Sequence, residues 1–121
     1  MANKILICDD DEGILDMLEV IFSYEGFDVT AETNSLKVHE LILAEAPDLV
    51  IIDLWMPVIS GDQVVRALRE DPQTAHIPIM VISASNDGRQ IALEAGADDF
   101  QAKPFDIDKL VAKIHDMLSI A

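Results

Sequence analysis

The sequence predicts an α/β fold built on a five-stranded parallel sheet with helices on both faces. Five short apolar runs alternate with five segments of helical periodicity along the 121 residues, and strict alternation of this kind is typical of parallel sheets. The third run, over residues 49–52, is apolar on both faces, as strands buried between two helical layers are. It ends in a single carboxylate, Asp53, at the end of the strand where such folds hold their ligands.

The first half of the chain contributes two strands and two helices. The strands are predicted over residues 4–8 and 27–31, and the second is a weaker edge strand. Apolar side chains recur at helical spacing over residues 12–25. Ser35 is predicted to cap the next helix, over residues 35–46, because serine is a favoured N-cap residue.

The second half contributes three strands and three helices. The strands are predicted over residues 49–53, 77–82 and 99–102. Two helices are predicted between them, over residues 62–70 and 87–95, and Asp106 is predicted to cap a last amphipathic helix. For five such units, right-handed crossovers favour the flavodoxin-like (βα)5 doubly wound sandwich, with strand order 2-1-3-4-5.

Length and composition limit the class of protein. The chain has the size of one domain, so residues 1–121 are expected to form a single unit. Its 8 basic and 23 acidic residues give a net charge of −15, which disfavours direct nucleic acid binding because phosphates need clustered lysine and arginine. No apolar run is long enough to span a membrane, and the lone Cys8 cannot form an internal disulfide. A cytoplasmic location is expected.

Three carboxylates are predicted to converge at one edge of the sheet. The strand order places the topological switch point between the first and third strands, which end at Asp9-Asp10 and at Asp53. Clustered carboxylates repel one another, and a bound divalent cation relieves that repulsion. A site made of oxygen ligands favours Mg²⁺, Ca²⁺ or Mn²⁺ over zinc. Ser83 and Lys103 end the neighbouring strands, which adds a hydroxyl and an ammonium that could hold a phosphoryl group on a nucleophilic Asp53.

Several short motifs follow the strand ends in order. They are Ile-Cys-Asp-Asp-Asp at residues 7–11, Val-Ile-Ile-Asp-Leu-Trp-Met-Pro at 50–57 with Gly61, Val-Ile-Ser-Ala at 81–84, Gly-Ala-Asp-Asp-Phe at 96–100 and Lys-Pro-Phe at 103–105. Through these motifs the chain resembles, over essentially its whole length, the receiver domain of two-component response regulators, in particular the single-domain, chemotaxis-regulator-like members. Each motif alone is weak, and together they are specific.

The resemblance implies a role for each residue of the acidic site. Asp53 would accept a phosphoryl group from a histidine kinase or a histidine phosphotransfer protein. The carboxylates of Asp9, Asp10 and Asp53 and the main-chain carbonyl of Trp55 would hold Mg²⁺, with Mn²⁺ as an alternative.

The resemblance also implies a switch. Lys103 would contact the phosphoryl group, and Ser83 would hydrogen-bond to it. Phe100 would be the switch aromatic, which turns inward when Ser83 moves to the phosphate. Serine and phenylalanine stand where threonine and tyrosine are commoner, so this switch has no tyrosyl hydroxyl. The Lys103–Pro104 bond would be cis.

Partners are implied by the same resemblance. The surface made by the fourth helix, fifth strand and fifth helix would change on phosphorylation and bind a downstream protein, a linked output domain or a second copy in a homodimer. No direct binding to nucleic acid or to a membrane is expected. On the first helix, Met17, Val20 and Tyr24 widen the apolar arc beyond the core-facing stripe. Ordinary packing and a docking face for the kinase are both consistent with that arc.

Two other functions remain open on the sequence alone, although we expect a signalling switch and not a turnover enzyme. One is a Mg²⁺-dependent phosphatase or phosphotransferase with a covalent aspartyl phosphate. A haloacid-dehalogenase-type site would want a second carboxylate where Trp55 stands. The other is a receiver-like interaction module that works without phosphorylation. A nucleotide- or flavin-binding domain is disfavoured, because the turn at residues 9–13 is acidic and lacks a glycine-rich phosphate cradle.

Overall fold

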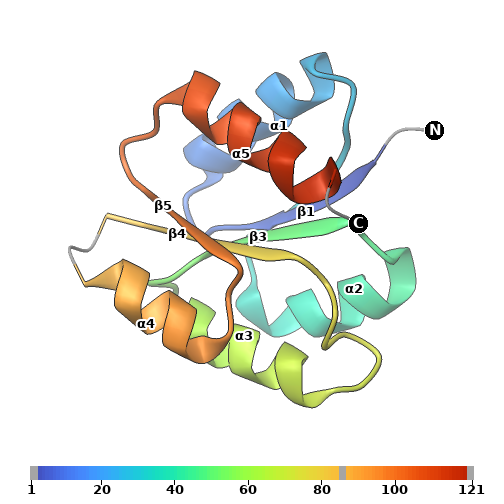
Figure 1. Cartoon of the computed structure of the whole chain (residues 1–121), viewed down its shortest axis with the longest axis vertical. Helices are drawn as coiled ribbons and strands as arrows, with labels where there is room; N and C mark the ends of the chain where they lie inside the picture. The colour runs from blue at the N-terminus through green and yellow to red at the C-terminus, as the bar shows by residue number, and fades with distance from the viewer. Residues whose placement is uncertain (1–2, 85–86, 120–121) are drawn as a thin grey trace.

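The computed structural model describes residues 3–84 and 87–119, which form a three-layered α/β sandwich (Figure 1). The described residues contain one parallel sheet in the order β2-β1-β3-β4-β5. Its strands are β1 (Lys4–Cys8), β2 (Asp28–Glu32), β3 (Leu49–Asp53), β4 (Ile79–Ser83) and β5 (Asp99–Ala102). The predicted flavodoxin-like, doubly wound architecture is therefore confirmed.

Helices cover both faces of the sheet. They are α1 (Glu12–Tyr24), α2 (Val38–Glu45), α3 (Gly61–Glu70), α4 (Gly88–Ala95) and α5 (Ile107–Ser119). Figure 1 shows α1 and α5 on one face and α2, α3 and α4 on the other. Each face buries its own apolar cluster, so that Ile51 belongs to one core and its neighbour Ile52 to the other. Successive side chains of a strand point to opposite faces, which is why these strands are apolar at every position.

The central strand carries the first candidate site residue. All residues of β3 are buried, because β3 lies between β1 and β4 within the sheet and between the two helical layers. Burying each Leu, Val or Ile side chain of such a strand contributes roughly 1.5–3 kcal/mol. The apolar burial of residues 49–52 therefore holds Asp53, the last residue of β3, at the edge of the core.

Ser35 does not cap the second helix as predicted. A 3₁₀ turn over Ser35–Lys37 precedes α2, and the side chain of Asn34 accepts a hydrogen bond from the main-chain N–H of Leu36. Ser35 is buried, and its hydroxyl donates to the main-chain oxygen of Pro57 at 3.4 Å. This serine therefore ties the β2–α2 connection to the loop after β3 instead of starting the helix.

The other element bounds differ little from the prediction. β4 begins two residues later than predicted, at Ile79, because Pro78 has no N–H to donate to a strand ladder. β2 is shifted by one residue, and the remaining predicted helix bounds agree to within one residue. Within the described residues, no helix combines the length and apolar character that a membrane span requires.

Candidate functional site

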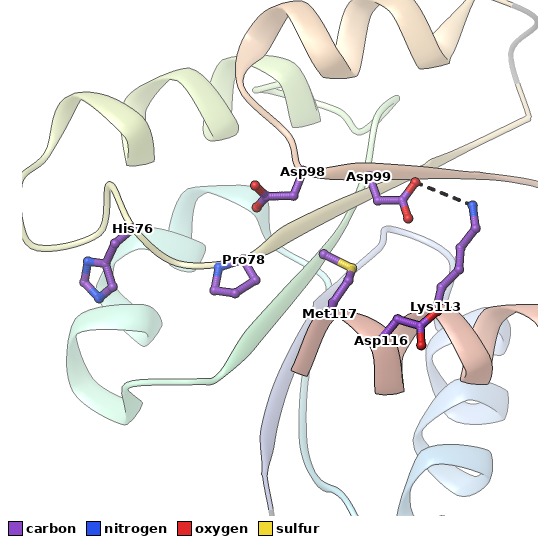
Figure 2. A pocket seen from close by; sticks show the side chains of 7 residues that line it. All are labelled: His76, Pro78, Asp98, Asp99, Lys113, Asp116 and Met117. Carbon is purple, nitrogen blue, oxygen red and sulfur yellow. Dashed lines mark ion pairs between the residues drawn. The ribbon is translucent and has the colours of Figure 1, made fainter. Parts of the chain in front are cut away.

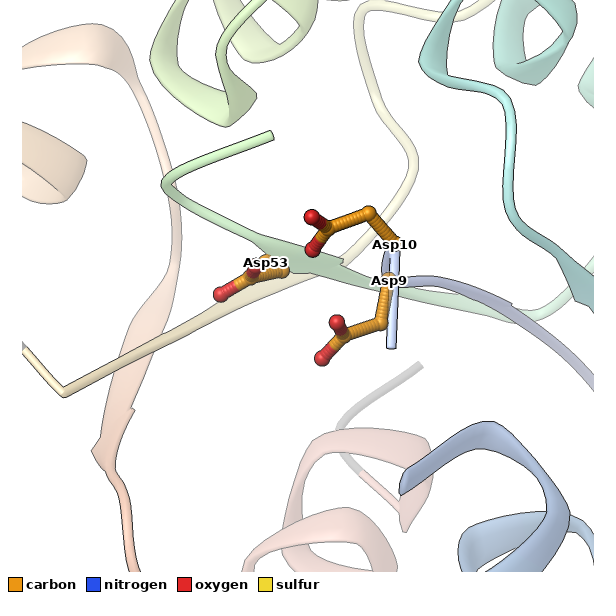
Figure 3. Close-up of side chains that lie close together, drawn as sticks. All are labelled: Asp9, Asp10 and Asp53. Carbon is orange, nitrogen blue, oxygen red and sulfur yellow. The ribbon is translucent and has the colours of Figure 1, made fainter. Parts of the chain in front are cut away.

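The carboxyl ends of β1 and β3 bring three carboxylates together. Asp9 and Asp10 follow β1, and Asp53 ends β3. One carboxylate oxygen from each lies within 4.8 Å of the other two (Figure 3). Asp9 is fully buried and Asp53 is 5% exposed, whereas Asp10 is exposed. The predicted cluster thus forms at the switch point of the sheet, and its all-carboxylate donor set fits a hard divalent cation.

The three consecutive aspartates after β1 have different roles. Oδ1 of Asp9 accepts from the main-chain N–H of Asp11 at 2.9 Å. The side chain of Asp11 in turn accepts from the N–H groups of Gly13 and Ile14, which makes it the N-cap of α1. Asp11 therefore starts the helix and orients Asp9, while Asp9 and Asp10 supply carboxylates to the cluster.

Lys103 lies between the two buried carboxylates. Its Nζ atom is 2.9 Å from Oδ2 of Asp9 and 3.3 Å from Oδ1 of Asp53. The lysine follows the end of β5, and the Lys103–Pro104 peptide bond is cis, as the resemblance implied. An ammonium has three N–H donors and can contact both acids at once. Lys103 therefore offsets part of the negative charge of the cluster.

Burial and charge shift the pKa of both Asp53 and Lys103. Burial, followed by the negative charge of Asp9, raises the pKa of Asp53 from 3.8 to about 6, against the lowering effect of Lys103. Burial alone would lower the pKa of Lys103, but its hydrogen bond to Asp9 and the charges of both acids outweigh burial and raise it. At pH 7 Lys103 is a cation and Asp53 is ionised, and any neighbour that adds or removes charge changes the protonation of Asp53.

The remaining predicted site residues lie around this cluster. Ser83 is the fully buried last residue of β4, and its main-chain oxygen accepts from the N–H of Lys103 at 2.9 Å. Phe100 lies in β5, beside β4, and is 7% exposed. Trp55 follows Asp53 by two residues, and its side chain is about half exposed. The predicted residues therefore lie at or just after the ends of four neighbouring strands, except Phe100, which lies two residues before the end of β5.

Two backbone features shape the loop after β3, one at a glycine of the sequence motif and one that the sequence did not indicate. A side chain at Gly61 would collide with the main-chain oxygen of Asp53, so a glycine is required at the start of α3. Val58 has φ of 73° and is 85% exposed. A β-branched residue rarely adopts this left-handed conformation, so no sequence signal marks the turn. Together these two residues set the path of the loop that contains Trp55.

A cavity lies at the opposite end of the strands, where β4 and β5 begin. Its volume is about 320 Å³, and it is lined by His76, Pro78, Asp98, Asp99, Lys113, Asp116 and Met117 (Figure 2). Asp98 accepts hydrogen bonds from Arg69 and from the N–H of Ile79, and Asp99 pairs with Lys113. None of the predicted site residues lines this cavity, and these two carboxylates hold the structure together there.

The fold and the site define the class of this protein. A doubly wound domain with carboxylates and a lysine gathered at its switch point is equipped to hold a cation and a phosphoryl group. The response regulator receiver domain family matches residues 5–115. The chain belongs to this family, so it is a phosphoacceptor signalling domain of two-component systems, and the phosphatase alternative is not favoured.

Individual relatives agree with this assignment. The chain is 37% identical over 123 residues to the transcriptional regulatory protein KdpE of Staphylococcus aureus, an alignment that covers 100% of this chain and 52% of KdpE. A response regulator from Desulfuromonas acetoxidans is 30% identical, with a TM-score of 0.87 and 98% of each chain covered. The chemotaxis response regulator CheY4 of Vibrio cholerae, 24% identical, shares the fold with a TM-score of 0.90 over 98% of this chain and 100% of CheY4. The chain spans about half the length of the curated relatives it matches.

Proposed function

We propose that residues 1–121 form one receiver unit in which Asp53 is the phosphoacceptor. The position of the Asp53 carboxylate carries this proposal: it ends the buried β3, lies 3.3 Å from Nζ of Lys103 and belongs to the acidic cluster. A histidine kinase or histidine phosphotransfer protein supplies the phosphoryl group. An oxygen of Asp53 forms a bond to phosphorus while the bond from phosphorus to the histidine nitrogen breaks, and the imidazole leaves.

The cation that serves this reaction is proposed to be Mg²⁺, which Mn²⁺ can replace. Its ligands would be the carboxylates of Asp9, Asp10 and Asp53 and the main-chain carbonyl of Trp55. Two of these carboxylates are buried and all three are close together, which supports a cation because their repulsion is otherwise only partly offset. When bound, the cation would supply positive charge next to the phosphoryl oxygens. Lys103 adds a second positive charge next to the carboxylate of Asp53.

The proposed switch links the phosphoryl group to the surface made by α4, β5 and α5. The hydroxyl of Ser83 donates to the phosphoryl group, and the ring of Phe100 packs inward behind it. The buried position of both side chains at neighbouring strands supports this assignment. The changed surface then binds a downstream protein, a linked output domain or a second copy of the chain.

The kinase or phosphotransfer protein is proposed to dock on α1. Met17, Val20 and Tyr24 are 41%, 70% and 91% exposed, so packing against the core does not account for their apolar side chains. A neighbouring cavity of about 500 Å³ is mostly apolar and is lined by Ile14, Met17, Ala84, Lys103, Pro104, Phe105 and Ile107. An apolar helix seated along this surface would bring its histidine towards Asp53.

The domain is proposed to take part in its own phosphorylation and dephosphorylation without turning over free substrates. A cytoplasmic location and the absence of direct nucleic acid or membrane binding also stay predictions, and the net charge of −15 supports the second. Sustained hydrolysis of p-nitrophenyl phosphate by the purified chain would contradict the proposal that it is not an enzyme.

Chemical mapping tests the phosphoacceptor. The protein is incubated with Mg²⁺ and phosphoramidate, and borohydride then reduces any acyl phosphate to an alcohol, which turns the modified aspartate into homoserine. Peptide mass spectrometry is expected to find homoserine at position 53. Homoserine at another aspartate, with position 53 unmodified, would contradict the assignment of Asp53.

A further inference from the structure

Gly88, the first residue of α4, lies so close to its neighbours that a side chain here would require them to shift by a few tenths of an ångström. A Cβ atom at this position would lie 3.0 Å from Cε1 and 3.2 Å from Cζ of Phe100, and 3.1 Å from Cβ of Ser83. Gly88 is itself buried. Because glycine weakens a helix relative to alanine, helix formation does not explain a glycine here, whereas these contacts do. One backbone position of α4 thus touches both residues of the proposed switch.

The main chain of Phe100 is held on both sides. Its N–H donates to Oδ1 of Asp99 at 2.7 Å, and its carbonyl accepts from Nζ of Lys113 at 2.9 Å. In the sheet, Phe100 also pairs with Val81 of β4. Because the strand is fixed in this way, a larger side chain at position 88 must displace either the ring of Phe100 or the start of α4.

The other end of α4 is anchored. Gly96 ends the helix with φ of 115°, and its main-chain oxygen accepts from Nε of Arg69 at 2.8 Å. The same guanidinium donates to two further main-chain oxygens and to the carboxylate of Asp98. Any displacement is therefore concentrated in the first turn of α4, next to Ser83 and Phe100.

We propose that Gly88 is a positioning residue. Because it has no side chain, Ser83 and Phe100 can pack against the first turn of α4 and fix the position of that turn. A hydrogen at position 88 lets the Phe100 ring pack inward against the helix. A methyl group would push ring and helix apart and disfavour the inward arrangement. This inference rests on the proposed function, in which the inward ring accompanies a phosphorylated Asp53. By linkage, disfavouring the inward ring lowers the affinity of the site for a phosphoryl mimic.

The packing is tested with Gly88→Ala in the full chain and no phosphodonor. The N–H of Ile91 donates to the main-chain oxygen of Asp87 across the first turn of α4, so its exchange rate, measured by NMR, reports on that turn. In an unhindered helix, alanine in place of glycine slows exchange. The proposal predicts the opposite, several-fold faster exchange, and predicts that adding Phe100→Leu restores slow exchange by making room.

The coupling is tested by titrating beryllofluoride, a phosphoryl mimic, at saturating Mg²⁺ and following Trp55 fluorescence. Gly88→Ala is expected to weaken binding by about fivefold or more, the lower end of a typical coupling between sites. Gln90→Ala is the matched control, because Gln90 is exposed on the same helix and its side chain reaches Glu94. It should leave both readouts unchanged.

The outcomes separate this inference from the proposed function. Slower exchange at Ile91 in Gly88→Ala overturns the proposal, and so does unchanged beryllofluoride affinity in a variant whose exchange is faster. A wild-type protein that shows no response to beryllofluoride contradicts the proposed function and with it the coupling. Exchange at Ile91 would then still decide whether Gly88 sets the packing of Phe100.

Discussion

The ammonium of Lys103 donates to Oδ2 of Asp9 at 2.9 Å and so joins the end of β5 to the end of β1. The other oxygen of Asp9 accepts from the N–H of Asp11, and the side chain is fully buried. In the proposed cation site, Asp9 would supply one of the ligand oxygens. Lys103 and the cation would then compete for the same carboxylate.

Removing this competitor should strengthen cation binding. Lys103→Ala is expected to raise the affinity for Mg²⁺ by about tenfold, equivalent to about 1.4 kcal/mol, because Asp9 and Asp53 are left without their ammonium. Phosphorylation of Asp53 should slow in the same variant, since a positive charge beside the phosphoryl group is lost. The affinity is measured by titrating Mg²⁺ and following Trp55 fluorescence.

Lys109→Ala, the same charge change at an exposed position of α5, should bind Mg²⁺ like the wild type. Mg²⁺ affinity in Lys103→Ala at or below the wild-type value would refute this competition.

Asp53→Asn is expected to stabilise the protein at pH 7.5 in EDTA but hardly at about pH 4. The pKa of Asp53 is raised from 3.8 to about 6, so between these pH values the folded state keeps a proton that the unfolded state has lost. Stability therefore falls as pH rises through this window. Above it, the ionised side chain destabilises the folded state by on the order of 2–3 kcal/mol, which asparagine removes.

Urea denaturation at the two pH values measures this difference. Asp16→Asn, at an exposed position of α1, is the control for the loss of one negative charge and should change stability little at either pH. An equal gain from Asp53→Asn at both pH values would show that ionisation of Asp53 is not the cause.

Arg69→Lys is expected to lower the free energy of unfolding by about 2 kcal/mol. The guanidinium of Arg69 donates to the main-chain oxygens of Ala75, Ile77 and Gly96 and to Asp98, and each hydrogen bond from a charged group contributes about 1.5–3 kcal/mol. A lysine keeps the charge but cannot satisfy these acceptors from one planar group. Arg66→Lys, exposed on the same helix, is the matched control for urea denaturation. If the two substitutions have equal effects, the contacts of Arg69 do not stabilise the fold.

Reversing charges on α1 should slow transfer from the protein partner. Asp16 and Glu19 are exposed on the helix that presents Val20 and Tyr24. Asp16→Lys and Glu19→Lys are expected to reduce the rate of transfer from a phosphorylated histidine kinase, because they change the charge around the proposed docking face. Phosphorylation of the same variants by phosphoramidate should keep the wild-type rate. Unchanged transfer from the kinase would remove α1 from the docking surface.

The acidic cluster could be predicted from the sequence because it depends on topology. Apolar runs at residues 4–8 and 49–52 identify two buried strands, and a parallel doubly wound sheet must bring their carboxyl ends together. Asp9, Asp10 and Asp53 therefore converge whatever the details of packing. The same reasoning placed Ser83 and Lys103 at the neighbouring strand ends, as found.

What could not be predicted depends on contacts between distant segments. Ser35 has the chemistry of an N-cap, but its hydroxyl donates to Pro57 in a loop 22 residues further along the chain. Val58 adopts a left-handed backbone conformation that its residue type disfavours. The crowding at Gly88 arises only because Phe100 and Ser83 fold against it. Local sequence patterns carry no signal for such contacts.

The intact mass of the protein after incubation with a small phosphodonor shows whether Asp53 is the phosphoacceptor. We expect a mass gain of one phosphoryl group that requires Mg²⁺, is lost in EDTA and is absent from Asp53→Asn. A single cooperative transition of Asp53→Asn in urea denaturation would show that its fold is intact. An undiminished mass gain in Asp53→Asn, or one independent of any divalent cation, would contradict the assignment of Asp53 as a phosphoacceptor served by the acidic cluster.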